Sequence, residues 1–296
     1  IAQSEPRNTP KKTDSKMIPV RPGVFVQGSP KSELGRYTNE RQVAVSLPHS
    51  FLMSATEVTQ KRWLSLVDRN PSYFSNCGGQ CPVDSVNWYE ALEYANRKSE
   101  AEGFERCYIL DSCVGEIGSA CGSSAQPVAS CEGEYSCAFV QPVEGLCSGY
   151  RLPTESEWEY VARAGSTTVT YGDQARLKES QFARFVDNAQ TKKNGLSCID
   201  DSTLCAPGKV GMYAPSTWGH YDMHGNLREW VWDGFGEYGT GPQLDPRIDI
   251  GMERVIRGSS FRSPASDVRA ALRGRQARVE HRPDILYRVE VRRRRR

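Results

Sequence analysis

The stretch from Gly149 to Gly165, GYRLPTESEWEYVARAG, constrains the fold most, because it encodes a helix with a defined beginning and end. Thr154 and Glu157 have the spacing of a capping box, in which each side chain accepts the backbone amide of the other residue. Apolar residues then recur at helical spacing and predict one buried face: Trp158, Val161 and Ala162. Glu159 and Arg163 are expected to pair on the outside of this helix, which ends at Gly165.

Local patterns elsewhere predict short elements joined by many loops. Thr59 can begin one helix, and Asn87 with Glu90 can begin another. Alternating apolar residues predict short strands at Gly23–Gln27 and Gln42–Leu47. The 26 glycines and 17 prolines favour loops over long regular elements.

Longer motifs relate the chain to a known family. They are IPVRPGVFVQGSP from Ile18, ATEVTQKRW from Ala55, CPVDSVNWYEALEYANRKSEAEG from Cys81, the Gly149–Gly165 stretch, GHYDMHGNLREWVWD from Gly219 and RVIRGSSFR from Arg254. Together, between Met17 and Arg292, they resemble the formylglycine-generating-enzyme (sulfatase-modifying-factor) family. The resemblance implies an α+β, C-type-lectin-like fold, rich in loops, with short strands and a few helices.

Family-like segments continue almost end to end, which favours a single domain over residues 17–296. Residues 1–16 are polar, contain proline and lack a hydrophobic period, and this predicts a disordered leader or tether. A stretch at about residues 104–148 contains six cysteines and no amphipathic period. We expect an insertion there that is held by its own disulfides, because it lacks the apolar surface to fold by burial.

The ten cysteines fall into three local sets of even number, which predicts disulfides formed in an oxidising compartment. The sets are Cys77 and Cys81; Cys107, Cys113, Cys121, Cys131, Cys137 and Cys147; and Cys198 and Cys205. We expect pairing within each set, with Cys77–Cys81 and Cys198–Cys205 as local bridges. Zinc at Cys77 and Cys81 is the alternative, but no nearby histidine or second close pair completes four ligands. The protein is therefore expected to be secreted, periplasmic or on the cell surface.

Charge and hydropathy argue against several classes of partner. A net charge of +2 gives no general attraction to nucleic acid or to an anionic membrane. No apolar run approaches the roughly 20 residues of a membrane-spanning helix. The run Arg292–Arg296 is a local exception, either a solvated tail or a contact for a polyanion. A protein, peptide or glycan partner remains, and the arginines near the C-terminus favour an acidic one.

The resemblance implies a specific chemistry that this chain lacks. In the family, two thiols that follow the segment matching Arg254–Phe261 bind copper and oxidise a substrate cysteine. This chain has no cysteine after Cys205, and Ser263 stands about where the first thiol is expected. A serine hydroxyl cannot replace a thiolate as a Cu(I) ligand. We therefore expect no copper, no formylglycine synthesis and no catalytic residue of that kind.

The resemblance also implies two structural calcium sites, in which amide, carboxylate and carbonyl oxygens surround a hard cation. Three residues match the second site: Asn226, Leu227 through its carbonyl, and Glu229. Asn188 matches the first site, with Asp200 or Asp201 as its acid. The alternative for the second site is that Asn226 holds a turn and Glu229 pairs with an arginine.

The favoured interpretation is an exported, non-catalytic domain whose C-terminal segment contacts a ligand. Variable proteins of diversity-generating retroelements resemble this fold and carry their ligand surface where Arg262–Leu286 lies here. Planar arginine side chains suit carboxylate, sulfate or phosphate groups. Candidate contacts are Arg262, Ser263, Asp267, Arg269, Arg273, Arg275, Arg278, His281 and Trp218. The alternative is a sulfatase-modifying-factor-like enzyme with altered, non-copper chemistry, in which Asp267, Glu280 or His281 acts as acid or base.

Overall fold

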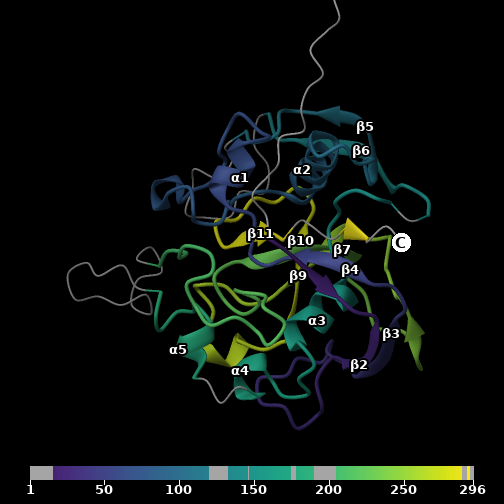
Figure 1. Ribbon diagram of the computed structural model, residues 1–296, viewed down its shortest axis with the longest axis vertical. Coiled ribbons are helices and arrows are strands. Elements are labelled where there is room, and N and C mark those ends of the chain that lie inside the picture. The colour runs from purple at the N-terminus through teal and green to yellow at the C-terminus, as the bar shows by residue number, and fades with distance from the viewer. Residues whose placement is uncertain are drawn as a thin grey trace, which may run out of the picture.

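The computed structural model describes residues 16–119, 133–145, 147–174, 178–189, 205–288 and 292–293. Within these residues, short strands and a few helices are joined by long loops (Figure 1). The described strands form four sheets, and none of the described helices is long and apolar enough to cross a membrane. The α+β class and the short elements expected from the sequence are confirmed.

Three helices begin where the sequence places capping residues. They are α1 (Gln60–Leu64), α2 (Trp88–Ala101) and α3 (Glu155–Arg163). Thr59 accepts the Arg62 amide at the start of α1, and full capping boxes begin α2 and α3. Shorter helical turns are η1 (Ser75–Cys77), α4 (Tyr171–Gln174), α5 (Glu179–Phe182) and η4 (Ala265–Asp267).

A four-stranded sheet crosses the middle of the molecule (Figure 1). Its strands, in spatial order, are β10 (Arg273–Ala277), β9 (Glu253–Arg257), β7 (Arg228–Gly234) and β11 (Ile285–Tyr287). Neighbouring strands are antiparallel, except that β11 is parallel to β7. Strand β10 therefore lies at one edge of this sheet.

Two smaller sheets contain the N-terminal strands. One has the order β1 (Met17–Val20), β4 (Phe51–Ser54) and β12 (Arg292–Arg293). The other has the order β2 (Gly23–Gln27), β3 (Val43–Leu47) and β8 (Gln243–Leu244). The predicted strands at Gly23–Gln27 and Gln42–Leu47 are thus present and pair with each other in antiparallel register.

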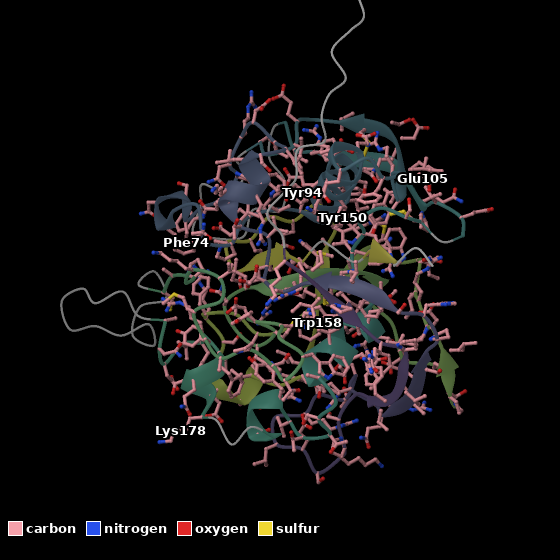
Figure 2. The ribbon with its side chains drawn as sticks, viewed as in Figure 1. Phe74, Tyr94, Glu105, Tyr150, Trp158 and Lys178 are labelled. Atoms are coloured by element: carbon pink, nitrogen blue, oxygen red, sulfur yellow. A yellow bond between two sulfur atoms is a disulfide. The ribbon has the colours of Figure 1, made fainter. Side chains whose placement is uncertain are left out.

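The central sheet separates two clusters of buried side chains. Trp230 and Trp232 of β7 belong to the cluster around α2, whereas Val231 of the same strand belongs to the cluster around Trp158 of α3. This alternation follows from the two-residue period of a strand. Figure 2 shows Trp158 near the centre of the molecule and Tyr94 of α2 in its upper half. Large aromatic side chains therefore fill both sides of the sheet.

The prediction that Glu159 and Arg163 pair on the outside of α3 is wrong, because both side chains lie in the interior. Glu159 is fully buried and Arg163 is 6% exposed. Glu159 Oε1 accepts the Gly28 amide at 2.8 Å, and Arg163 Nη2 donates to the Gly28 carbonyl at 2.7 Å. The two side chains are consequently a buried connection between α3 and the chain just after β2.

Within the cysteine-rich stretch, β5 (Tyr108–Val114) and β6 (Ser136–Pro142) pair in antiparallel register. Disulfides Cys107–Cys147 and Cys113–Cys137 hold it, and Cys77–Cys81 forms the predicted local bridge. Cys205 also takes part in a disulfide. The other cysteines with predicted partners, Cys121, Cys131 and Cys198, lie outside the described residues, as does the predicted leader apart from Lys16.

The side-chain rings of two core histidines have no hydrogen-bond partner among the described residues. His220 and His224 are each almost fully buried, and no described residue bonds to either ring nitrogen of either side chain. The His224 ring instead contacts the rings of Tyr171 and Phe182. Burial lowers the pKa of His224 to about 3, with Arg163 and Arg257 adding to the effect.

We predict that His224→Phe reduces the loss of stability in mild acid. The unfolded chain takes up a proton near pH 6.5, whereas the folded His224 stays neutral down to about pH 3. Stability is therefore lost as the pH falls below 6.5, and this residue accounts for about 2 kcal/mol at pH 5. Urea unfolding at pH 8 and pH 5 measures the difference. The control variant is His49→Phe, which makes the same substitution at an exposed histidine.

Candidate functional site

The segment after β9 forms a tight loop at the place where the family resemblance puts a thiol. Ser263 is 2% exposed; its hydroxyl accepts the Ser260 amide at 2.9 Å, and its carbonyl accepts the Val186 amide at 3.0 Å. Phe261 is fully buried, and its amide donates to the Asn226 carbonyl at 2.8 Å. Ser263 is thus a structural residue, which corrects its assignment as a ligand contact.

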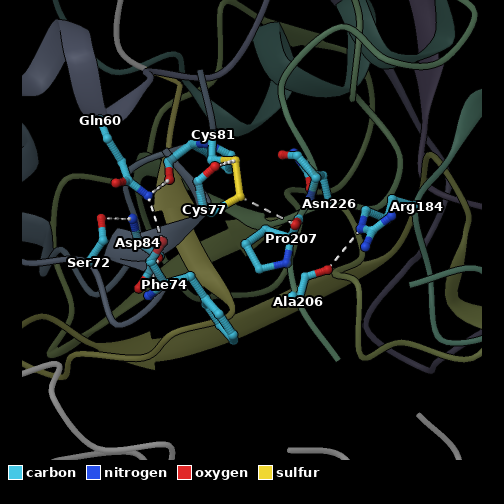
Figure 3. The surroundings of a disulfide bond; sticks show 12 residues. Gln60, Ser72, Phe74, Cys77, Cys81, Asp84, Arg184, Ala206, Pro207 and Asn226 are labelled. Atoms are coloured by element: carbon cyan, nitrogen blue, oxygen red, sulfur yellow. Dashed lines mark hydrogen bonds between the residues drawn. A yellow bond between two sulfur atoms is a disulfide. The ribbon is translucent and has the colours of Figure 1, made fainter. Parts of the chain in front are cut away.

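Figure 3 shows the Cys77–Cys81 disulfide beside Pro207, with Asn226 nearby. Cys77 Sγ is 3.7 Å from the Pro207 carbonyl oxygen, and the Gly208 amide donates to Asn226 Oδ1 at 2.9 Å. The side chain of Phe74, three residues before Cys77, packs edge-on against Phe261 with ring centroids 5.5 Å apart. The disulfide thus closes a local loop that contacts Pro207, and Phe74 just before this loop packs against Phe261.

Arg269 and Arg273 lie inside the protein, which corrects their assignment as ligand contacts. Arg269 binds both carboxylate oxygens of Glu40 at 2.7 Å and also contacts Glu33 at 2.8 Å. Arg273 binds both oxygens of Glu155, at 2.6 and 2.8 Å. Since each guanidinium is almost fully buried in ion pairs, neither can reach a ligand at the surface.

Arg275 and Arg278 are more accessible and share a surface with apolar side chains. Arg275 stands on β10 with 59% of its side chain exposed, 3.1 Å from Glu253 Oε2. Arg278 is half-buried, lies over the Tyr89 ring and is 3.4 Å from the Met252 sulfur. Met252 is 77% exposed. We define the β10 surface as Met252, Glu253, Arg275 and Arg278.

Arg262 and Asp267 are both half-buried, and no described hydrogen bond joins them. The Arg262 guanidinium lies over the Phe261 ring, and no described residue bonds to its Nε. Burial raises the pKa of nearby Asp84 to about 7, and the positive charge of Arg262 opposes this shift. Asp267 ends η4 and lines a small pocket of about 150 Å³. Both side chains remain candidates for ligand contact.

His281 is buried with other polar groups and does not face solvent. Its Nδ1 is 2.8 Å from the Ser85 carbonyl, its Nε2 is 3.2 Å from Asn87 Nδ2, and carboxylates of Glu90 and Glu134 lie 3.7 Å from its ring. Burial lowers the pKa of His281 and raises that of Glu90 to about 8. The structure therefore corrects its assignment as a ligand contact, because the side chain is buried.

The residues matched to the second calcium site have protein partners. Asn226 Nδ2 donates to Glu57 Oε2 at 2.6 Å, and Arg288 Nε lies 3.0 Å from Glu229 Oε1. Glu229 Oε2 also accepts the Trp158 indole N–H at 2.7 Å. These contacts match the alternative in which Asn226 holds a turn and Glu229 pairs with an arginine.

Several buried carboxylates lie around this site. Burial, together with the charges of Asp222 and Glu229, raises the pKa of Glu57 well above its usual value. Burial also raises the pKa of Asp222 to about 6. Three buried carboxylates thus interact with one arginine, Arg288. Sequence reasoning missed Glu57, Asp222 and Arg288, although Glu57 and Asp222 lie within the quoted motifs, because no local pattern shows that these residues come together. No described group of three or more acidic, cysteine or histidine side chains is arranged to hold a metal.

The first calcium site can be described only in part. Asn188 Oδ1 accepts the Phe185 amide at 2.9 Å, and its Nδ2 donates to the Ala183 carbonyl at 2.8 Å, so the side chain closes a turn. Asp200 and Asp201 lie outside the described residues. The assignment of calcium to these three residues stays a prediction.

A pocket and a groove lie away from the C-terminal segment that carries the candidate arginines. Trp218 is half-buried and forms one wall of a pocket of about 320 Å³ beside β2. A polar groove of about 480 Å³ lies between the end of β6 and residues 244–249, where Arg151 binds Glu157 and Arg247 contacts Asp249. No local pattern in the sequence predicts the groove, because its walls come from segments far apart in the chain.

This geometry defines an α+β domain of the C-type-lectin-like type whose C-terminal segment presents arginines and no thiol. The chain belongs to the family of sulfatase-modifying factor enzyme 1-like domains, whose match covers residues 2–293. The family inferred from the sequence motifs is therefore confirmed.

Relatives in this family have diverse names. Chaperone protein LppX of Paenibacillus barcinonensis is 30% identical over 215 residues, 71% of this chain and 70% of that protein. The formylglycine-generating enzyme of Streptomyces coelicolor is 34% identical over 120 residues, 38% of this chain and 37% of the enzyme. The serine/threonine-protein kinase pkn1 of Chlamydia pneumoniae is 24% identical over 92% of this chain, which spans only 37% of the kinase.

Solved structures support the fold assignment. Treponema denticola variable protein 1 superposes with a TM-score of 0.72 at 24% identity, covering 98% of this chain and 100% of that chain. PvdO from Pseudomonas aeruginosa superposes with a TM-score of 0.67 at 20% identity, with the same coverage. At these identities the likeness establishes the C-type-lectin-like fold alone.

We predict that Arg273→Met destabilises the protein by about 3 kcal/mol or more, because it leaves the Glu155 carboxylate buried without its principal partner. Arg275→Met, on the same strand, should change stability by about 0.5 kcal/mol or less, since its ion pair is exposed. Urea unfolding of both variants gives the comparison. Equal effects of the two substitutions would contradict the structural role of Arg273.

Proposed function

We propose that this chain is an exported, non-catalytic domain that binds an acidic protein or peptide through its C-terminal segment. The observation that carries the proposal is the β10 surface, where Arg278 contacts the exposed apolar side chain of Met252 and the exposed Arg275 pairs with the adjacent Glu253. Apolar contacts supply affinity, and arginines select carboxylate groups by paired hydrogen bonds. Arg262 and Asp267 are further candidate contacts on the same segment.

The names of two similar proteins favour a binding role. LppX is named as a chaperone, and the Treponema denticola protein is named as a variable protein. The C-terminal segment of this chain is the part in which we expect a diversified surface, as in variable proteins of diversity-generating retroelements. A glycan with acidic groups is the alternative ligand.

The alternative of an enzyme with non-copper chemistry has less support. Formylglycine synthesis in the family depends on thiols after the segment that matches Arg254–Phe261, and this chain has no cysteine beyond Cys205. Of the candidate acids and bases, His281 is buried among Ser85, Asn87 and two carboxylates. The disulfides support export, since such bonds form and persist in oxidising compartments.

We predict that substitutions on the β10 surface weaken binding to an acidic probe without unfolding the protein. The probe is a fluorescein-labelled peptide of ten glutamates that alternate with glycines, measured by fluorescence polarisation at two salt concentrations. The double variant R275A/R278A should raise Kd by about ten-fold. The double variant R69A/R247A gives the matched control, because it removes two accessible positive charges elsewhere. An equal loss in both variants would show that binding is non-specific attraction and would defeat the proposal.

We further propose that calcium binds at Asn226, Leu227 and Glu229, and a second ion at Asn188 with Asp200 or Asp201. The excess of buried carboxylates over arginines near Glu229 supports the first of these ions, since a divalent cation would offset the repulsion among Glu57, Asp222 and Glu229. In this proposal the calcium ions are structural and order the surrounding loops.

We predict that calcium raises the melting temperature of chelator-treated protein, because it binds only the folded state. At a concentration about 100 times Kd the gain is about 2.7 kcal/mol. Magnesium at the same concentration should have a much smaller effect, since it demands a smaller, octahedral site. In Glu229→Gln, the difference in melting temperature between protein in calcium and protein in chelator should be smaller than in the wild type, whatever the absolute stability of that variant. Identical melting curves of the wild type in calcium and in chelator would contradict the proposal.

A further inference from the structure

The pocket beside β2 lies along an unpaired strand edge. Strand β2 is the first strand of its sheet and pairs only with β3 among the described residues. Three consecutive residues of β2, Val24, Phe25 and Val26, all line the pocket of about 320 Å³. Because successive side chains point to opposite faces of a sheet, a hollow that touches all three runs along the edge of the strand.

Apolar and aromatic side chains line this edge. Val24 is 72% exposed and Val26 is 50% exposed, although both are strongly apolar. On the other side of the pocket, the Tyr160 ring lies 5.2 Å from Phe25 and 4.9 Å from Trp218, measured between ring centroids. Edge strands are normally protected by charges, prolines or covering elements, so two exposed valines on an edge indicate a surface that another chain covers.

Positive charges stand at both ends of β2. Arg21 precedes the strand, while Lys31 and Arg41 adjoin the pocket-lining residues Pro30 and Gln42, and all three cationic side chains are exposed. Nearby Glu33 and Glu40 do not neutralise them, because both carboxylates bind Arg269. The edge therefore offers an apolar centre flanked by cations.

From these features we propose that the β2 edge binds an extended peptide segment that is apolar at its centre and acidic at both ends. The peptide adds a strand to the sheet through backbone hydrogen bonds with β2, and one of its apolar side chains enters the pocket between Val26, Tyr160 and Trp218. Five residues of strand span about 17 Å, so a segment of five to seven residues reaches the cations at both ends. This site is separate from the β10 surface.

The test uses a labelled seven-residue peptide of sequence EEVFVEE and fluorescence polarisation with the whole protein. We expect saturable binding that Val26→Asp weakens by about ten-fold or more, because the substitution removes an apolar contact and adds repulsion. Val26 is half exposed, so the variant should fold normally, and circular dichroism checks this. The matched control is Val114→Asp, which places the same charge on an exposed valine of β5.

Two further probes separate the proposal from its alternatives. The peptide KKVFVKK should bind at least about ten-fold more weakly, because its charges oppose those at the ends of β2. A peptide whose central residues are N-methylated should also bind weakly, because it cannot complete the strand pairing. Equal binding of all three peptides, or of wild type and Val26→Asp, would overturn the proposal.

Failure of the proposed peptide binding at the β2 edge can be distinguished from failure of the proposed binding at the β10 surface. In the R275A/R278A background, Val26→Asp should weaken binding of EEVFVEE by the same factor as in the wild type if the peptide occupies the β2 edge. Loss of binding in that variant, with no effect of Val26→Asp, would assign the peptide to the β10 surface and refute the present inference. Light scattering tests whether a second copy of this chain covers the β2 edge. A dimer that Val26→Asp dissociates would show that β2 pairs with a second copy and would refute the peptide proposal.

Discussion

Buried pairs of arginine and glutamate join the parts of this fold. Arg257 of β9 is fully buried and contacts Glu159 and Glu155 of α3, while Arg273 of β10 binds Glu155 from the neighbouring strand. Arg257 also donates to the carbonyls of Ala270, Ala271 and Leu272, which fixes the loop that precedes β10. Removing one member of such a pair leaves a charge without compensation in the interior. The position of the C-terminal segment therefore depends on α3.

The helices could be predicted from sequence because their signals are local. Each N-cap side chain bonds an amide three residues away, so Thr59, Asn87 and Thr154 identify their helix starts without knowledge of the fold. The family and the lectin-like fold could also be recognised, because the motifs that carry them are long and ordered.

The roles of the arginines could not be predicted in the same way. Arg269 and Glu40 are 229 residues apart, and Arg273 and Glu155 are 118 apart, so no local pattern reveals that they pair. A sequence shows the density of arginines near the C-terminus but not which of them face inward. The same limit applies to Glu159 and Arg163, whose spacing of four residues suits a surface pair equally well.

The division of the core by the central sheet affects how unfolding of this protein would be observed. Trp63, Trp88, Trp230 and Trp232 belong to the cluster around α2, whereas Trp158, with Trp218 packed nearby, belongs to the other. Indole fluorescence is consequently weighted toward one side of the sheet. An optical melting curve would follow mainly that half, and a looser transition on the side of α3 would pass with little change in emission. Only agreement with a probe of the whole backbone would establish that the two halves unfold together.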